Sequence, residues 1–361
     1  MLAAMPSRRS CALALAASTI LAASTPAHAE EPPRPPRARR ALAAGAAIFP
    51  GVLVRGTGHW LVGERRTAKR LLVLEGLGLG LAALGGIPLG VTGGAEETLP
   101  GLALLFPAAA LLFPTIAADA WGAAGGACIA GTPAPPPALD LAAGYTFVGD
   151  PHVPFANLAT ADVTAWLGPA HARVSGWLGD GTWQARAVAG WRVLGPRPGE
   201  RPDDTSALDV TVAAAEERRR DQGLRVATAE VGARARLDLA RVGPSLRGTF
   251  ATVGLGLGAE RIRYSATGAA DTSGLVSGHV GWGFALGDGA TRALETELYY
   301  EHRRDTLAGG LTPPIAYNGF IGYVGAVTTA WSGRTGVSLR VDVGSAYVVS
   351  LAAHVRLPEL P

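Results

Sequence analysis

The chain has 361 residues, of which 48% are apolar and only 17% are charged. This composition excludes a largely disordered protein, because so many apolar side chains must be covered by a core or by lipid. The net charge is +3, and no stripe of basic residues alternates with aromatic ones. Nucleic acid is therefore not a predicted partner.

Residues 1–29 predict a secretory signal peptide. An arginine pair precedes an apolar run, and Ala27-His28-Ala29 supplies the small residues that flank a cleavage point. Cleavage there would leave Cys128 as the one remaining cysteine, so no internal disulfide is predicted. We expect the protein to be exported.

A Pro/Arg-rich spacer, residues 30–40, leads into a Gly/Ala/Leu-rich helical region, residues 41–131. Within that region, residues 76–95 and 99–118 are each long enough and apolar enough to span a bilayer as helices. Prolines inside both segments predict breaks or kinks. We expect this region to form an exported helical subdomain that packs against the following domain or inside it.

The stretch 49–72 is the most distinctive part of the helical region. Its Pro-Gly, followed by Gly-x-Gly-His-Trp and another glycine, loosely resembles the turn between short membrane helices in TM2-like proteins. That resemblance implies no catalytic role. Without the Lys-Ser/Thr ending of a phosphate loop, these glycines do not predict nucleotide binding. His59 is expected to be a turn residue or an interface anchor, and no metal site is predicted.

A Pro-rich linker, residues 132–138, separates the helical region from residues 139–361, where apolar and polar residues alternate with a period of two. This pattern predicts about twelve strands. They are residues 139–149, 158–167, 169–179, 182–194, 207–217, 223–239, 245–263, 274–287, 291–303, 319–331, 334–343 and 345–357.

The length of these strands favours a membrane barrel over a soluble sandwich. Sandwich strands usually have about 5 to 6 residues, whereas a membrane strand needs about 9 to 11. Loops are mostly longer after odd strands, as in barrels whose termini share one side of the membrane. The long stretch 195–206 and the tight turn at Asp180-Gly181 break this rule, which suggested a missed or extra strand before residue 207.

Aromatic residues near strand ends predict an interfacial girdle, because Trp and Tyr favour the boundary between lipid and water. Trp183 and Trp191 are eight residues apart on one strand, and therefore roughly 20 Å apart along the normal of a tilted barrel. Trp282, Trp331 and Tyr347 are the other candidates.

The strand region thus resembles Gram-negative outer-membrane β-barrel proteins, a similarity of pattern that no specific motif carries. It implies a mainly β fold, an antiparallel membrane β-barrel of about twelve strands behind a short α-helical region. It also implies an outer-membrane location, contact with membrane lipid and insertion by the barrel-assembly machinery. The chain departs from the family at its end, where Pro358 and Pro361 stand in place of a terminal aromatic residue.

Charged residues on the polar face of the strands predict a paired network in the lumen, because lipid would penalise them on the other face. The candidates are Glu230, Arg234, Arg236, Asp238, Glu260, Glu295, Glu297, Arg340 and Asp342. Such a network could close the lumen or leave a small aqueous path for a small solute. A structural barrel and a diffusion pore are therefore equal interpretations.

Two alternatives remain open from the sequence. Ser277 and His279, with Glu301 or His302 on the next strand, could make an outer-membrane hydrolase. However, residues two apart on a strand lie about 7 Å from each other, too far for direct proton transfer. The other alternative places the helices in the inner membrane and makes the strand region a periplasmic β-sandwich. No catalytic or cofactor motif is recognised, so an enzyme is not predicted.

Overall fold

The computed structural model describes residues 35–92, 98–150, 157–200, 203–220, 223–288, 291–303, 306–307 and 322–357. The predicted signal peptide and the prolines near the end of the chain lie outside these ranges. The helices are α2 (Arg37–Ile48), α3 (Thr57–Val62), α4 (Arg65–Thr92), α5 (Thr98–Ala124) and the short 3-10 helices η1 (Gly126–Cys128), η2 (Leu239–Arg241) and η3 (Pro244–Leu246).

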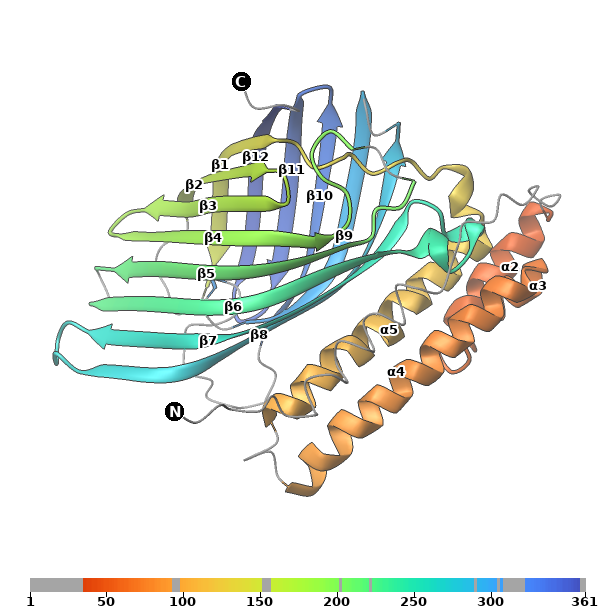
Figure 1. Ribbon diagram of the computed structural model, residues 1–361, viewed down its shortest axis with the longest axis horizontal. Coiled ribbons are helices and arrows are strands. Elements are labelled where there is room, and N and C mark those ends of the chain that lie inside the picture. The colour runs from red at the N-terminus through yellow and green to blue at the C-terminus, as the bar shows by residue number, and fades with distance from the viewer. Residues whose placement is uncertain are drawn as a thin grey trace, which may run out of the picture.

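The strands follow the helices and form one sheet (Figure 1). They are β1 (Leu139–Gly149), β2 (Asn157–Leu167), β3 (Ala170–Gly179), β4 (Thr182–Leu194), β5 (Ala207–Arg219), β6 (Leu224–Asp238), β7 (Thr249–Tyr264), β8 (Ala270–Gly287), β9 (Arg292–His302), β10 (Tyr323–Ser332), β11 (Thr335–Val343) and β12 (Tyr347–Leu357).

The sheet is a closed barrel in which every strand is antiparallel to its neighbours. Strand β1 closes the barrel against β12, with Leu139 opposite Leu357 and Gly149 opposite Tyr347. The predicted fold class is confirmed. The periplasmic sandwich is wrong, because a sandwich leaves edge strands and this sheet has none.

The first residue of β1 pairs with the last residue of β12, so both lie at one end of the barrel, which we call the termini end. The opposite end is the far end. The long 195–206 stretch is a genuine connection at the termini end, and Asp180 and Gly181 form a tight far-end hairpin. The suggestion of a missed or extra strand before residue 207 was wrong.

The sequence analysis made the connection between β6 and β7 too short, since it extended one strand to residue 239 and began the next at 245, whereas β6 ends at Asp238 and β7 begins at Thr249. The side chain of Asp238 accepts a hydrogen bond from the Ala240 backbone N–H at 2.9 Å and so caps η2. Residues 239–248 therefore form two 3-10 turns at the termini end.

The alternating pattern puts apolar side chains on the outside of the barrel. Because successive side chains of a strand point to opposite faces, the partners in each ladder define an outer face and a lumenal face. Exposed apolar residues cover the outer face on most strands, among them Leu141, Val163, Val174, Val212, Val231, Leu298, Val324, Leu339 and Leu351. Such a surface is far larger than a monomer in water exposes and is typical of a lipid-facing wall.

The two long helices are continuous, contrary to the expected breaks. Helix α4 runs through Pro88, and α5 runs through Pro107 and Pro114. The Thr115 hydroxyl donates to the Leu111 carbonyl at 2.7 Å, which satisfies one carbonyl in the turn around Pro114. Neighbouring side chains of this kind let apolar helices keep internal prolines. Residues 65–91 and 100–124 are long and apolar enough to cross a membrane, by length and composition.

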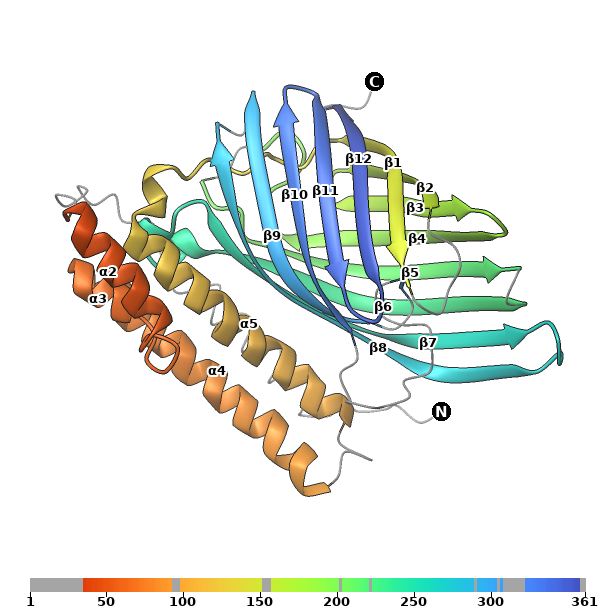
Figure 2. The ribbon, with the colours of Figure 1, turned by 180° about the vertical axis from the view of Figure 1, so that it is seen from behind.

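Helices α4 and α5 form a hairpin outside the barrel, with its long direction close to that of the barrel axis (Figures 1 and 2). Helix α5 lies against the outer face of β7 and β8, where Phe106 packs on Val280. A side chain at Gly278 would collide with the Phe106 ring, so this glycine permits the close approach. Of the two expected positions of the helical region, packing against the barrel is the observed one.

The termini end of the hairpin is fixed by a second apolar cluster. Leu71 of α4 and Ala118 of α5 pack on Leu239, Val242 and Leu246 of the β6–β7 connection, and all five are buried. Contacts on both the barrel wall and this connection hold the helices to the barrel at two levels.

We expect Phe106→Ala to loosen the hairpin from the barrel, because it removes the ring that fills the space over Gly278. A buried Phe→Ala change costs about 3 kcal/mol. Phe113→Ala is the matched control, since Phe113 is 65% exposed. Trypsin cleavage of the 65–70 segment in the micelle-bound protein reports the loss. Equal cleavage rates of the two variants would contradict this packing.

Candidate functional site

The lumen holds two ion pairs that join β6 to β9. Arg236 Nη1 lies 2.8 Å from Glu295 Oε1, and Arg234 Nη2 lies 3.2 Å from Glu297 Oε1. Strands β7 and β8 separate β6 from β9 in the barrel order. The side chains of each pair therefore extend across the lumenal face of β7 and β8. This is possible only if the residues on that face have small side chains.

Glycines on the lumenal face of β7 and β8 leave space for the charged side chains. A Cβ at Gly256 would lie 2.2 Å from Glu230 Oε1, and a Cβ at Gly281 would lie 2.5 Å from Glu297 Oε1. A Cβ at Gly254 would lie 3.2 Å from the Cβ of His279. The carboxylates thus occupy the space that larger residues would fill.

His279 joins the carboxylates of β9. Its Nδ1 lies 2.6 Å from Glu301 Oε2, and its Nε2 lies 2.9 Å from Glu297 Oε1. The Thr252 hydroxyl donates to the same Glu297 oxygen at 2.5 Å. Arg234 is also within 3.1 Å of His279 Nε2. Positive and hydrogen-bonding groups therefore surround these two partly buried carboxylates.

Glu230 is the centre of a second group. It accepts from Arg186 at 2.9 Å, from Arg303 at 2.7 Å and from the Ser277 hydroxyl at 2.5 Å. Arg186 and Arg303 were not among the predicted residues. Arg186 lies on β4, and Arg303 directly follows β9. No local pattern in the sequence indicates that their side chains reach Glu230 on β6.

Arg340 and Asp342 form a third group on β11. Arg340 Nε lies 2.8 Å from Asp342 Oδ2, and the Tyr299 hydroxyl donates to Asp342 Oδ1 at 2.5 Å. Arg340 also donates to the Tyr323 hydroxyl at 3.2 Å. Both tyrosines also belong to a cluster of buried apolar side chains, so they connect this charged group to the cluster.

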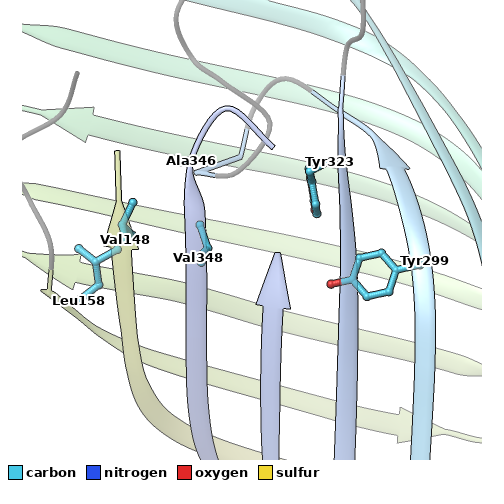
Figure 3. Close-up of a cluster of buried hydrophobic side chains, with 6 residues drawn as sticks. All are labelled: Val148, Leu158, Tyr299, Tyr323, Ala346 and Val348. Carbon is cyan, nitrogen blue, oxygen red and sulfur yellow. The ribbon is translucent and has the colours of Figure 1, made fainter. Parts of the chain in front are cut away.

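That cluster lies on the lumenal face of the strands near the far end of the barrel (Figure 3). Its buried members are Val148, Leu158, Tyr299, Tyr323, Ala346 and Val348. Leu307, from the connection after β9, packs against it, as do Trp177 and Val327. Apolar side chains from β1, β2, β9, β10 and β12 and from two connections therefore line one side of the far-end lumen.

At the termini end, the linker crosses the barrel mouth from β8 to β1. The Gly131 N–H donates to the Ala285 carbonyl, and the Thr132 N–H donates to the Gly287 carbonyl. Ala130 thus forms an isolated antiparallel β-bridge with Leu286 of β8, and the linker begins there. The next residues, 133–136, line a cavity of about 280 Å³ together with Arg192, Asp209, Arg234, Arg236, Glu295 and Glu297. The linker lies beside the charged lumen and narrows its opening.

Asp238 differs from the other residues of the predicted network. Asp238 accepts from the Thr205 N–H at 3.1 Å and from the Thr205 hydroxyl at 3.0 Å, while its backbone N–H donates to the Ser206 hydroxyl. It therefore ties two termini-end connections together and makes none of the described ion pairs. Glu260 is buried on the lumenal face of β7.

The hydrolase arrangement does not form. The Ser277 hydroxyl donates to Glu230, whereas both ring nitrogens of His279 face carboxylates. His302 lies on the outer face, where its ring packs edge-on against Phe106 at 5.5 Å. Among the described residues, no histidine is therefore in position to take a proton from Ser277, and the Glu230 carboxylate that accepts its hydrogen bond is paired with Arg186 and Arg303.

A different serine has the geometry of a nucleophilic triad. His59 Nδ1 lies 2.5 Å from Asp119 Oδ1, and His59 Nε2 lies 3.0 Å from the Ser245 hydroxyl. However, that hydroxyl donates to Glu64 at 2.5 Å, and His59 has no exposed surface. A substrate could not reach this serine, so catalysis is not supported.

These residues instead attach the helices to the barrel. Asp119 of α5 also accepts from the backbone N–H groups of Gly56 and His59, at 2.9 and 3.1 Å, and so caps α3. His59 and Glu64 then reach Ser245 in the β6–β7 connection. The expectation that His59 is an interface anchor agrees with this geometry.

The predicted girdle residues do not share one environment. Trp183, Trp191 and Tyr347 lie on the outer face, and Trp191 is 56% exposed. Trp282 also lies on the outer face, but Trp121 of α5 packs against it with ring centroids 6.2 Å apart. Its ring therefore contacts helix α5.

Trp331 is a correction to the predicted girdle. It lies opposite Gly336 on the lumenal face, next to His354 at 5.3 Å and beneath the guanidinium of Arg356 at 4.5 Å. The prediction was based on its position near a strand end. The alternation of β10 decides the face instead, because Val324 points outward and Trp331 is an odd number of residues away.

Comparisons with known proteins identify no family. No family model matches the chain, and no curated protein matches it. Among solved structures, the NanC porin is 8% identical, with 62% of this chain and 100% of that chain covered and a TM-score of 0.39. The KdgM porin is 6% identical, with 60% of this chain and 99% of that chain covered and a TM-score of 0.36. The translocator domain of autotransporter NalP from Neisseria meningitidis is 13% identical, with 61% of this chain and 88% of that chain covered and a TM-score of 0.34. These scores are low, and we draw no functional conclusion from them.

No group of three or more His, Cys, Asp or Glu side chains is arranged to hold a metal ion within the described ranges. The carboxylates of Glu295 and Glu297 face arginines, which would repel a cation. What the arrangement can do chemically is to hold charges in place and to restrict passage.

We expect Gly256→Ala to destabilise the barrel, because its new methyl group would displace the Glu230 carboxylate or the Ser277 hydroxyl. Crowding of this kind costs about 1 to 3 kcal/mol. Gly274→Ala, whose methyl group would meet no atom within 4 Å, is the matched control. Urea unfolding, followed by heat-modifiable gel mobility, measures both. Equal stability of the two variants would show that the carboxylate does not need this space.

Proposed function

We propose that the protein is an outer-membrane β-barrel of structural type, whose lumen is closed by its own side chains and whose wall anchors a helical hairpin. The apolar outer face, the even number of strands and the placement of both barrel termini at one end support this proposal. On this proposal, residues 1–29 direct export and the barrel-assembly machinery inserts residues 139–361.

The filling of the lumen is the observation that carries the structural interpretation over the pore. We infer that the apolar cluster closes the far end, since the linker crosses the termini end and the Arg–Glu pairs lie between the two. The predicted charge network, with Arg186, His279, Glu301 and Arg303 added, acts as the polar core of the barrel on this proposal. Its charges neutralise one another where water is scarce.

The outward-facing aromatic residues have a matching role. Trp183 and Trp191 lie near the two ends of β4 on its outer face, and Tyr347 begins β12. We assign these three to the interfacial girdle, where an amphipathic ring is most stable. Membrane lipid is then the partner of the outer face, and no solute is required.

Conductance in planar bilayers tests the closed lumen. We expect the wild-type barrel to insert without ionic current steps, because its side chains leave no continuous path. The variant R234A/R236A/E295A/E297A, which deletes both bridging pairs, should produce steps. The swap R236E/E295R keeps one pair with opposite polarity and should stay silent.

Regular current steps from the folded wild-type protein would contradict the structural proposal and favour the pore. Silence of the four-alanine variant would show that the ion pairs are not what closes the lumen. Recovery of the protein with the outer-membrane fraction, with mobility that changes on heating, tests the location separately.

A further inference from the structure

Four arginines point outward at the far end of β5, β6 and β7. Arg218 lies directly opposite Arg225, and Arg225 lies directly opposite Arg263, so three neighbouring strands carry them in one row. Arg261 lies two residues from Arg263 on the same face of β7. All four side chains are exposed. We call these residues the rim arginines.

The outward direction follows from the strand alternation. Arg218 is six residues from Val212 on β5, and Arg225 is six residues from Val231 on β6; both valines are exposed on the outer face. An even spacing keeps side chains on one face of a strand. The rim arginines therefore continue the lipid-facing surface toward the far end.

The rim arginines have little internal compensation. Glu216 lies 2.7 Å from Arg225. The guanidinium groups of Arg218, Arg261 and Arg263 have no carboxylate partner among the residues that the structure describes. Like charges directly opposite each other destabilise a strand pair. This arrangement therefore needs an anion from outside the described chain to become favourable.

The height of the row indicates which anion is near. Trp183 lies directly opposite Arg218 on the outer face, in the same row as the rim arginines. Tryptophan on a lipid-facing wall marks the level where hydrocarbon gives way to headgroups. Arg218 therefore lies at headgroup level, where the phosphate of a lipid is the available anion, and the other rim arginines continue from it on the next two strands.

We propose that the rim arginines bind the phosphate groups of a phosphorylated lipid in the far-end leaflet. This inference rests on the proposed membrane position of the barrel. Adjacent strands are about 4.8 Å apart, so two guanidinium groups can reach one phosphate. Each planar guanidinium can donate two parallel hydrogen bonds to phosphate oxygens, which an ammonium group cannot do. Arginine on three successive strands fits a lipid with more than one phosphate.

Binding of bisphosphorylated lipid A to the full-length, detergent-solubilised protein tests the proposal by native mass spectrometry. The ladder variant R218Q/R225Q/R263Q removes the row. The control R197Q/R247Q/R334Q removes three exposed arginines from the termini end and keeps the total charge change equal. We expect lipid A to bind the wild type and the control alike, and the ladder variant at least about tenfold more weakly.

Two further measurements keep the test independent of that variant's folding. Dephosphorylated lipid A should bind the unmutated protein at least about tenfold more weakly than the bisphosphorylated form. The variant R218K/R225K/R263K, which keeps the charge, should bind with intermediate affinity, since it loses the paired donors. Inorganic phosphate at millimolar concentration should not displace the lipid.

Equal lipid binding by the folded ladder variant, or by phosphorylated and dephosphorylated lipid, would overturn the proposal. Displacement by inorganic phosphate would also overturn it, because the site would then be an anion site with no preference for lipid. The proposed function fails on a different observation, namely absence of the protein from the outer-membrane fraction. A barrel recovered there that ignores lipid phosphate contradicts this inference alone.

Discussion

Backbone hydrogen bonding in a medium without water is the constraint on which the rest of this structure depends. An unpaired N–H or C=O in hydrocarbon costs several kcal/mol, so a sheet in that medium must close on itself. The pairing of β1 with β12 along eleven residues removes both edges at once. Closure then fixes the side chains, because alternate residues have to face lipid or lumen.

In the lumen, the difficulty is the burial of polar and charged side chains. Every polar residue that the outer face cannot accept is placed in a narrow interior, where an unpaired charge is costly. The barrel meets this requirement with pairs that extend over a glycine-lined wall, such as Arg236 with Glu295 over β7 and β8. Large side chains on those strands would push the charges apart. Glycine on β7 and charge on β6 and β9 are therefore parts of one arrangement.

The helical hairpin follows the same rule from the outside. Exposed apolar residues such as Leu79 and Ile87 on α4 would be unfavourable in water, and the hairpin that carries them lies beside the barrel (Figure 2). The polar contacts of the hairpin gather at the termini end, where Asp119, His59 and Ser245 meet out of solvent. Apolar packing in the middle and hydrogen bonds at one end hold it on β7 and β8.

The sequence alone was sufficient for whatever depends on local alternation. Twelve strands and an apolar outer face follow from a period of two, and even the lumenal position of Trp331 could have been found from its spacing to Val324. Contacts between distant segments had no such signal. His59 is 60 residues from Asp119 and 186 from Ser245, and Glu230 is 73 from Arg303. Only the packed helices and the closed barrel bring these groups together.

Accessibility of spin labels on β5 tests the central claim, that lipid covers the outer face, most directly. In a Cys128→Ser background, labels at Val210 and Val212 should collide mainly with lipid-soluble oxygen. Labels at Asp209 and Thr211, which face the lumen, should be shielded from oxygen. The opposite alternation, with the valines reached only by a water-soluble nickel complex, would contradict the account.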